Sequence, residues 1–418
     1  MNVKALQRAD RWVGVPLCLG LSVFRAWFGR ALPDCSRPPR SLLFVKLAEQ
    51  GSTVLAYPAL KRAAEIVGRD NLYFIAFEDN RFILDALRVV PEGNVITVSA
   101  DGIPRFLATM LRALRRLRAL HLDAAIDLEF FSRGSAALTY LSGARRRVGF
   151  HAFFGAGPYR GNLMTHRLIY NSHLHTSQTF LSLVEAALAD PAVLPTFDAR
   201  PACVWDNSLG FSPSEADRTA IRNALGKGST PAGPVILLNP NSGDLLPLRR
   251  WPSERYVELA RRLVTRYPEA LVAFTGAPNE AAAAEDLARR AGSERCISLA
   301  GRTTLPQLLA LYTLADVLVT NDSGPAHFAA LTPIHVVALF GPETPKLFGV
   351  STPRHSTLWA GLACSPCVNA YNNRQSPCRD NLCMKAIGVD EVFAEVCRLY
   401  ESRRPRPAPA ATSLPAAS

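Results

Sequence analysis

The chain has 418 residues, of which 48% are hydrophobic and 20% are charged. This composition excludes a disordered or fibrous chain, and the length predicts two domains. A formal net charge of +12 calls for an anionic partner. No zinc-finger spacing and no basic motif interleaved with aromatic residues supports nucleic acid. We therefore expect a phosphorylated substrate or a membrane surface as the partner.

The first 40 residues are expected to form a separate N-terminal segment. Trp12 to Phe24 is uncharged, but it is shorter than the roughly 20 residues that a membrane-spanning helix needs. Basic residues precede it, as in a signal peptide, yet Asp10 interrupts them and no clear cleavage site follows. We expect a helix that lies either on a membrane surface or on the protein itself.

From residue 41 the chain alternates between short apolar runs and helical patterns, which is typical of βαβ units around a parallel sheet. In the first domain, residues 41–200, the expected strands are Ser41–Lys46, Leu72–Ala76, Val95–Val98 and Asp123–Leu128. The expected helices are Ser52–Val67, Asn80–Leu87 and Arg105–Leu120. Residues 160–214 are less regular and are expected to carry connecting helices.

A second alternating series begins at Pro234, within residues 201–400. Its expected strands are Val235–Asn239, Ala270–Thr275, Cys296–Leu299, Val317–Thr320 and Val336–Phe340. Its expected helices are Ser253–Tyr267, Asn279–Ala291, Leu305–Ala315 and one that starts near Pro325. Two doubly wound halves place a ligand cleft between the carboxyl ends of their sheets. The Ala/Pro-rich residues 401–418 are expected to be disordered.

The segment VLVTNDSGPAH, residues 317–327, runs from an apolar strand into a polar turn and a helix. Ser323 suits the N-cap of that helix, Pro325 suits its first turn, and Gly324 allows a ligand to approach the backbone. Free N–H groups at such a helix start attract a diphosphate, and His327 lies one turn in. In isolation, a well-capped helix with a hydrogen-bonded histidine is the commoner structure, so the context decides.

That context consists of three further strand-to-loop passages in the second half. They are NPNSG (residues 239–243, with Asn241 and Ser242), FTGAPNE (residues 274–280) and LFGP (residues 339–342). Arg249 and Arg250 precede the helix predicted at Ser253, where guanidinium groups would neutralise a leaving diphosphate without a metal ion. Solvated surface charge is the commoner arrangement of two such arginines.

In the first half, KLAEQGS, residues 46–52, is the matching strand-to-loop-to-helix junction. Gly51 permits close approach, and Glu49 is the only acid in the loop. A carboxylate at such a junction could act as a base that accepts the proton of a substrate hydroxyl, and Glu49 is the candidate for it. An ordinary exposed loop glutamate is the competing interpretation.

These segments, in this order, resemble glycosyltransferase family 9, the heptosyltransferases of bacterial lipopolysaccharide core synthesis. The resemblance covers roughly residues 42–387 and rests on FVKLAEQGSTVLAYPAL, DAAIDLEFFSRGSAAL, RRRVGF, RRWPSERY, LAGRTTLPQLLAL, TNDSGPAHFAAL and VALFGPETP. It implies a GT-B architecture of two Rossmann-like domains, with the acceptor in the first and the nucleotide sugar in the second. It also implies inverting, metal-independent transfer of heptose from ADP-heptose to a lipopolysaccharide core or related anionic glycolipid.

The resemblance also assigns site residues. By the matching motifs, the donor's diphosphate and sugar would contact Asp322, Ser323, Gly324 and His327. Arg249 falls where the family places a phosphate-binding lysine, and Glu280 falls near an acid that holds the ribose. Thr304 and Leu305 lie near the adenine wall.

One position departs from the family pattern. The aspartate proposed as the catalytic base directly follows the glycine of the first loop, and here that position is Ser52. A serine hydroxyl is not a comparable base at neutral pH. Either Glu49 has taken the role, which we favour, or the transferase activity is weak, altered or absent.

Four cysteines are clustered as Cys364-x2-Cys367-x10-Cys378-x4-Cys383. The spacing is similar to that of a structural zinc or iron–sulfur site, although it lacks a symmetric pair of CxxC motifs. Four unliganded thiols are the alternative. Disulfides are disfavoured because a nucleotide-sugar enzyme works in the reducing cytoplasm. No cofactor is expected for catalysis.

Arginines 145–147 and the basic helix carrying Arg112 to Arg118 lie in the acceptor half. They would suit an acidic glycolipid at the inner face of the inner membrane, and generic surface charge is the alternative. Other functions stay open: the same fold with a UDP- or GDP-sugar donor, or a non-catalytic nucleotide-sugar-binding protein. A redox or iron–sulfur protein would rest on the cysteines alone.

Overall fold

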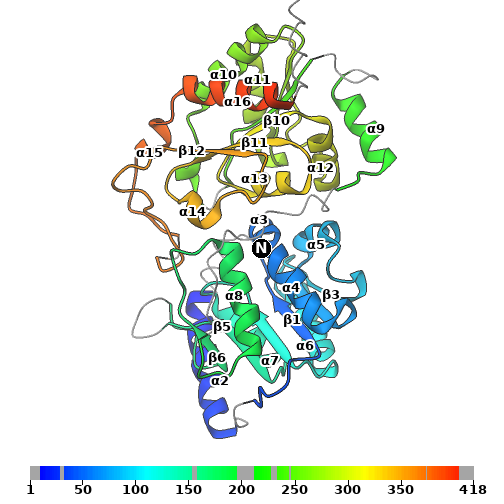
Figure 1. Cartoon of the computed structure of the whole chain (residues 1–418), viewed down its shortest axis with the longest axis vertical. Coiled ribbons are helices and arrows are strands. Elements are labelled where there is room, and N and C mark those ends of the chain that lie inside the picture. The colour runs from blue at the N-terminus through cyan, green and yellow to red at the C-terminus, as the bar shows by residue number, and fades with distance from the viewer. Residues whose placement is uncertain are drawn as a thin grey trace, which may run out of the picture.

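The computed structural model describes residues 10–28, 33–152, 158–194, 211–226, 233–243, 246–372 and 374–403. Two lobes, each built around a parallel sheet, lie one above the other along the long axis (Figure 1). The predicted α/β class with two doubly wound sheets is confirmed. No helix in these ranges is long and apolar enough to cross a bilayer.

The first lobe contains a parallel sheet with the strand order β3-β2-β1-β4-β5-β6. Its strands are β1 (Leu42–Val45), β2 (Leu72–Phe77), β3 (Val95–Val98), β4 (Ala124–Asp127), β5 (Arg146–Phe150) and β6 (His166–Leu168). Its helices are α2 (Gly14–Phe28), α3 (Gln50–Leu55), α4 (Tyr57–Val67), α5 (Arg81–Leu87), α6 (Ile103–Ala119), α7 (Arg133–Leu141) and α8 (Thr176–Leu188). The central strands β1 and β4 are buried along their whole length, because helices cover both faces of the sheet.

The second lobe repeats this topology, with the strand order β12-β11-β10-β7-β8-β9. Its strands are β7 (Val235–Asn239), β8 (Leu271–Phe274), β9 (Cys296–Ser298), β10 (Val317–Asn321), β11 (His335–Phe340) and β12 (His355–Trp359). Its helices are α9 (Glu215–Ala224), α10 (Ser253–Arg266), α11 (Ala281–Ala291), α12 (Leu305–Leu314), α13 (Gly324–Phe328), α14 (Pro345–Phe348), α15 (Leu382–Lys385) and α16 (Val389–Arg403). The carboxyl end of β10 leads into α13, which contacts α3 of the first lobe, and β7 runs parallel to β10, as a ligand cleft between the sheets requires.

The predicted strands agree with the observed ones to within one or two residues, but one predicted helix does not hold. The helix expected over Ser52–Val67 is interrupted at Ala56, where α3 ends and α4 begins. Pro58 has no N–H to donate to the carbonyl of Val54, so the hydrogen-bond ladder breaks there. The strands β5, β6 and β12 are not predicted from the sequence, because they are short and carry arginine or histidine instead of an apolar run.

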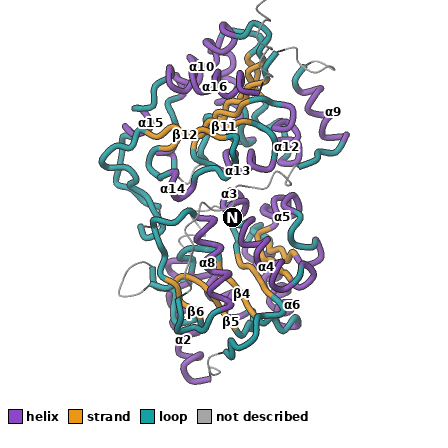
Figure 2. Tube along the Cα trace, viewed as in Figure 1, coloured by secondary structure: helices purple, strands orange, loops and turns teal. Residues whose placement is uncertain are grey.

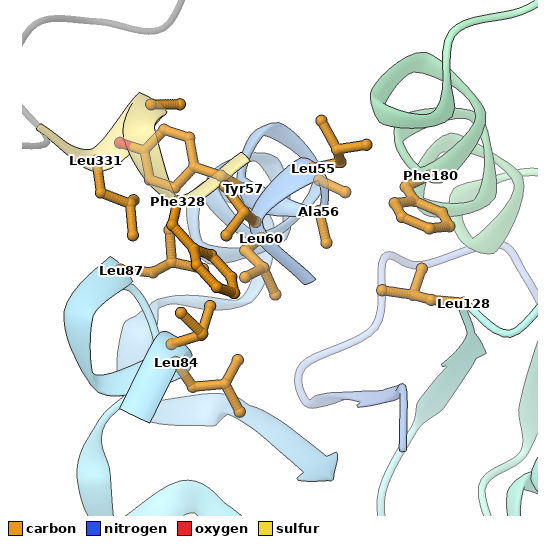
Figure 3. Close-up of a cluster of buried hydrophobic side chains, with 14 of the residues drawn as sticks. Leu55, Ala56, Tyr57, Leu60, Leu84, Leu87, Leu128, Phe180, Phe328 and Leu331 are labelled. Atoms are coloured by element: carbon orange, nitrogen blue, oxygen red, sulfur yellow. The ribbon is translucent and has the colours of Figure 1, made fainter. Parts of the chain in front are cut away.

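Apolar side chains of the two lobes pack against each other beside the cleft (Figure 3). Phe328 and Leu331, at the end of α13 and just after it, belong to the same buried cluster as Tyr57, Leu84 and Leu87 of the first lobe. This contact holds the two sheet edges close together, since separating them would expose the cluster to water.

A loop-rich segment between β12 and α15 returns from the second lobe to the first (Figure 2). The ring of Tyr371 packs against those of Phe131 (5.5 Å between centroids) and Tyr170 (5.3 Å), both in the first lobe. This contact places Arg374, three residues later, at the cleft.

Candidate active site

The loop of residues 46–52 and the turn within residues 317–327, both singled out in the sequence, meet across the cleft. A Cβ atom added at Gly51 would lie 2.8 Å from Cδ2 of His327 and 3.2 Å from the Cα of Gly324. Only glycine fits between these groups without displacing them. Gly51 therefore permits the close approach that was predicted, but the group that approaches is the facing helix α13 of the other lobe.

Glu49 lies directly before α3 in a left-handed backbone conformation (φ 67°), which aims its side chain across the cleft. Its carboxylate forms an ion pair with Arg374, and its Oε2 lies 3.8 Å from Nζ of Lys46 and 3.1 Å from Oγ of Ser52. Burial acts to raise the pKa of Glu49, but Arg374 and Lys46 outweigh it and lower the pKa to about 2. Glu49 is therefore an ionised carboxylate at neutral pH, held by cations from both lobes.

Lys46, at the end of β1, is the most buried of these cations. Its side chain has no exposed surface, and its Nζ lies 3.6 Å from Oε2 of Glu129. Glu129 in turn accepts a hydrogen bond from the backbone N–H of Leu47 (2.9 Å). The buried ammonium group of Lys46 therefore lies between the carboxylates of Glu49 and Glu129 and balances part of their negative charge.

On the opposite side of the cleft, Arg249 is built into a group of charges instead of being solvated. Its Nη1 lies 3.5 Å from Oδ2 of Asp322 and 3.6 Å from Oε2 of Glu343, and it donates to the carbonyl of Asp322 (3.0 Å). Only 11% of its side chain is exposed, so the interpretation as free surface charge is wrong for Arg249. Arg250 points elsewhere and donates to the carbonyl of Gly243 (3.1 Å).

Burial strongly affects protonation on this side of the cleft. Burial and the neighbouring carboxylate of Glu343 raise the pKa of Asp322 well above its ordinary value. Burial, with the nearby His175 and Arg249, lowers the pKa of His327 to about 3. His327 is therefore neutral at ordinary pH, and its ring offers one hydrogen-bond donor and one acceptor without adding charge beside an incoming diphosphate.

The start of α13 differs from the prediction in one respect. Ser323 occupies the N-cap position, but its hydroxyl makes no capping hydrogen bond and lies 3.1 Å from the carbonyl of Asn321, to which it donates. Ser323 is therefore the N-cap residue, as predicted, but Oγ is turned back toward β10 and does not cap the helix. The helix is also only five residues long, so its dipole is small and the nearby arginines supply most of the positive charge.

The remaining predicted donor residues line the same lobe. A Cβ atom added at Gly276 would lie 2.9 Å from Nδ2 of Asn241 and 3.0 Å from Oε2 of Glu280, so these two side chains flank the end of β8. Thr304 caps α12 by accepting from the N–H of Gln307, and Leu305 packs against the core. Ser242 donates to the carbonyl of Leu246 (3.3 Å). The roles of these residues toward a donor stay predictions.

Several buried polar atoms around the cleft make no hydrogen bond within the described part of the protein. They are Lys46 Nζ, Asn241 Nδ2, Arg249 Nε, Asp322 Oδ2, His327 Nδ1 and Glu343 Oε1. Leaving buried polar atoms without hydrogen bonds is costly, and native proteins rarely gather them in one place without a function. Donors and acceptors converging from both lobes fit a ligand with many oxygen atoms.

Two residues of this site were missed in the sequence. Arg374 bridges the lobes: it is paired with Glu49, and its Nε lies 3.5 Å from Oε1 of Glu343. Its guanidinium lies 5.3 Å from the ring centroid of Phe348. Glu343 directly follows the LFGP turn, so its place after a strand was a usable signal, whereas no local pattern marks Arg374.

The arginines expected to hold an acidic acceptor are placed differently. Arg146 is buried and donates to the carbonyls of Ala187 (2.9 Å) and Asp34 (3.0 Å), while Arg147 donates to that of Leu163 (2.8 Å). They begin β5 and therefore lie at the edge of the sheet away from the cleft. The prediction that Arg146 and Arg147 suit an acidic glycolipid is therefore not supported, because their guanidinium groups bind backbone carbonyls of the protein itself.

The four cysteines lie in the segment that returns to the first lobe and in α15. Cys364 and Cys378 are exposed, while Cys383 is buried, and the proximity of Cys367 and Cys378 contributes to a raised pKa of Cys383, after burial. Sγ of Cys367 accepts from Ser376 (3.2 Å), and Sγ of Cys378 donates to the carbonyl of Asp380 (3.0 Å). No group of three or more His, Cys, Asp or Glu in the described ranges is arranged to hold a metal ion.

Two Rossmann-like lobes that face each other across a polar, charged cleft define the GT-B class of glycosyltransferase folds. Residues 110–376, more than half of the chain, match glycosyltransferase family 9 (heptosyltransferase). The protein belongs to this family.

Among curated proteins, the chain is similar to lipopolysaccharide heptosyltransferase 2 of Escherichia coli, with 29% identity over 50% of this chain and 58% of that protein. It is also similar to lipopolysaccharide heptosyltransferase 2 of Salmonella typhimurium, with 39% identity over 24% of this chain and 29% of that protein. These alignments therefore span little more than half of the relatives' length, or less.

Solved structures show the same fold over a longer stretch. The ADP-heptose lipopolysaccharide heptosyltransferase II of Escherichia coli superposes with a TM-score of 0.68 and 20% identity, covering 87% of this chain and 99% of that one. A family 9 glycosyltransferase of Veillonella parvula superposes with a TM-score of 0.66 and 18% identity, covering 87% and 97%.

Proposed function

We propose that the protein transfers heptose from ADP-heptose to an anionic glycolipid of the lipopolysaccharide core type, with inversion and without a catalytic metal ion. One observation carries this proposal: an ionised Glu49 faces a group of buried polar atoms around Arg249 that lack hydrogen bonds. The names of the relatives, which are lipopolysaccharide heptosyltransferases, support the choice of donor and acceptor.

In the proposed reaction, Glu49 accepts the proton of the acceptor hydroxyl while that oxygen bonds to the anomeric carbon of the sugar. The bond between this carbon and the diphosphate oxygen breaks, and ADP leaves on the opposite face, which inverts the configuration. Arg249 and Arg374 stabilise the negative charge that develops on the diphosphate. These two guanidinium groups take the part that a metal ion plays in other transferases.

Arg374 links donor binding to the base. Its guanidinium pairs with Glu49 and is the main cause of the lowered pKa of that carboxylate, about 2, which makes Glu49 a weak base. A diphosphate beside Arg249 attracts the same guanidinium and loosens its pairing with Glu49. The pKa of Glu49 then rises, so the base strengthens when the donor is in place.

Purified protein, ADP-heptose and heptose-deficient lipopolysaccharide test the proposal, with mass spectrometry of the acceptor as the readout. We expect the addition of one heptose, unaffected by EDTA, and no transfer from UDP- or GDP-sugars. Transfer from one of those donors instead would overturn the choice of ADP-heptose. Donor binding without transfer to any core acceptor would support a non-catalytic nucleotide-sugar-binding protein.

Since lipopolysaccharide cores are built on the inner face of the inner membrane, we place the protein in the cytoplasm or peripherally on that face.

A structural zinc ion or iron–sulfur cluster at Cys364, Cys367, Cys378 and Cys383 remains a prediction, and no step of the reaction depends on it. Elemental analysis and a visible absorption spectrum of protein purified without oxygen test it. The four thiols are not arranged as ligands in the described ranges, so a metal ion would have to draw them together; it would appear as one zinc or a coloured iron centre per chain, lost when Cys367 is replaced with serine. Metal-free, colourless protein with four titratable thiols at these positions would contradict this prediction.

A further inference from the structure

The helix α2 exposes an apolar face and turns its polar groups inward. Cys18 is buried, Arg25 donates to the carbonyl of Met164 (2.9 Å), and Ser22 accepts from the N–H of Asn162 (2.7 Å). Arg25 is the one charged residue between Trp12 and Phe28, and it faces the protein. This arrangement is the reverse of an ordinary surface helix, which exposes its charges to water.

The outward side chains of this segment are large and well exposed. They are Trp12 (75% exposed), Val13 (63%), Leu17 (42%), Leu19 (55%), Val23 (52%), Phe24 (54%), Trp27 (79%) and Phe28 (70%). A contiguous apolar face of this kind is rare on soluble proteins unless a partner or a membrane covers it.

The basic helix α6 adds a second apolar stripe on the same side of the first sheet. Both α2 and α6 contact α7, which lies between them. On α6, the exposed residues Ile103 (65%), Leu107 (58%) and Leu111 (49%) follow one another at every fourth position. The helix contains five arginines and no acidic residue, and Arg112 and Arg115 are exposed. Apolar residues flanked by arginines are typical of helices that lie in a membrane interface.

The position of α2 relates this face to the cleft. Asp10 accepts hydrogen bonds from the N–H groups of Arg133 and Gly134 (2.8 Å each) at the start of α7. The start of α7 follows the carboxyl end of β4, and this is the sheet edge on which Glu49 lies. The end of the segment that carries Trp12 is therefore the end nearest the acceptor side of the cleft.

We propose that α2 and α6 form a docking surface for an anionic lipid bilayer, which lays the acceptor lobe against the membrane. Trp12, two residues before α2, and Trp27, near its end, suit the interface between head groups and acyl chains. The arginines of α6 complement acidic head groups. A second copy of the chain fits less well, because neither helix carries an acidic residue to pair with the partner's arginines. The docking stands apart from the proposed reaction, although it would bring a glycolipid acceptor to the cleft.

Co-sedimentation of the full chain with vesicles tests this surface. We expect binding to vesicles of phosphatidylcholine with phosphatidylglycerol, weakened by salt, and little binding to phosphatidylcholine alone. The double variant Trp27→Ser, Phe28→Ser is expected to lower vesicle binding about 10-fold or more. Arg112→Gln with Arg115→Gln is expected to remove most of the dependence on acidic lipid. As a matched control, Val193→Ser with Leu194→Ser removes exposed apolar residues elsewhere on the lobe and should leave binding unchanged.

Two outcomes would overturn the docking surface. One is binding that the Trp27→Ser, Phe28→Ser variant leaves intact. The other is a dimer in solution, measured by light scattering, that this variant dissociates and that does not bind vesicles. Transfer to a deacylated, water-soluble acceptor should be unchanged in the variant, while transfer to a vesicle-embedded acceptor falls. If the chain transferred no sugar at all, vesicle binding would still be measurable, so the two proposals fail separately.

Discussion

Replacing Glu49 with glutamine is expected to lower kcat for heptose transfer about 100- to 10,000-fold, the usual contribution of a general base. Glutamine keeps the size of the side chain and its contact with Ser52 but accepts no proton. Donor affinity should not fall, because Arg249 and the polar atoms around it belong to the other lobe and Arg374 is released from its pairing with Glu49. Initial rates with saturating donor, together with calorimetric binding of ADP, separate the two effects.

The neighbouring Ser52 provides both the control and a rescue. Ser52→Ala removes one contact to the carboxylate (3.1 Å) and should leave most of the activity. Adding Ser52→Asp to Glu49→Gln places a carboxylate at the position where the family resemblance implies an aspartate, and we expect it to recover part of kcat. Full transfer by Glu49→Gln alone would show that another group accepts the proton.

Replacing Arg374 with glutamine is expected to lower kcat about 100-fold or more and to shift the pH dependence of kcat/KM, which reports the free enzyme. The loss in kcat follows because a guanidinium near the leaving diphosphate disappears. The pH shift follows from the ion pair with Glu49, which lowers the pKa of that carboxylate. Activity is lost as pH falls through the pKa of the base. Without Arg374 this pKa is higher, so the acidic limb of the profile should move to higher pH.

Arg374→Lys keeps the positive charge without the planar guanidinium. Its kcat should lie between those of the unchanged protein and of Arg374→Gln, with a smaller shift of the acidic limb. Arg302→Gln serves as the control, because that side chain is 63% exposed and pairs loosely with Glu285 (3.9 Å). A fall in kcat with an unmoved acidic limb would mean that Arg374 only supports the local structure.

Much of the fold could be predicted because it is encoded over short stretches. Buried parallel strands appear as continuous apolar runs, so strands such as Val95–Val98 and Val235–Asn239 were placed to the residue. Short strands with charged residues, such as β5, were not predicted. Arg146 and Arg147 at its start have the pattern of exposed surface residues, and only the structure shows the carbonyl groups that they bind.

The candidate site, like the fold, could be predicted only in part. Loops at the carboxyl ends of strands identified Glu49, Arg249 and Asp322, because a parallel sheet always brings those loops to one edge. Their pairing was not predictable. Glu49 meets Arg374 across 325 residues of sequence, and no local pattern records a contact between side chains so far apart.

By itself, the sequence determined two doubly wound sheets, the loops that meet at the cleft, and an apolar N-terminal helix. Local periodicity and turn chemistry suffice for these features. Only the tertiary structure decided that Glu49 is held by cations from both lobes, that Arg146 and Arg147 are internal, and that α2 turns its apolar face outward. Ion pairs and side-chain exposure depend on which residues, distant in sequence, become neighbours in the folded protein, and only the packing of the elements determines those neighbours.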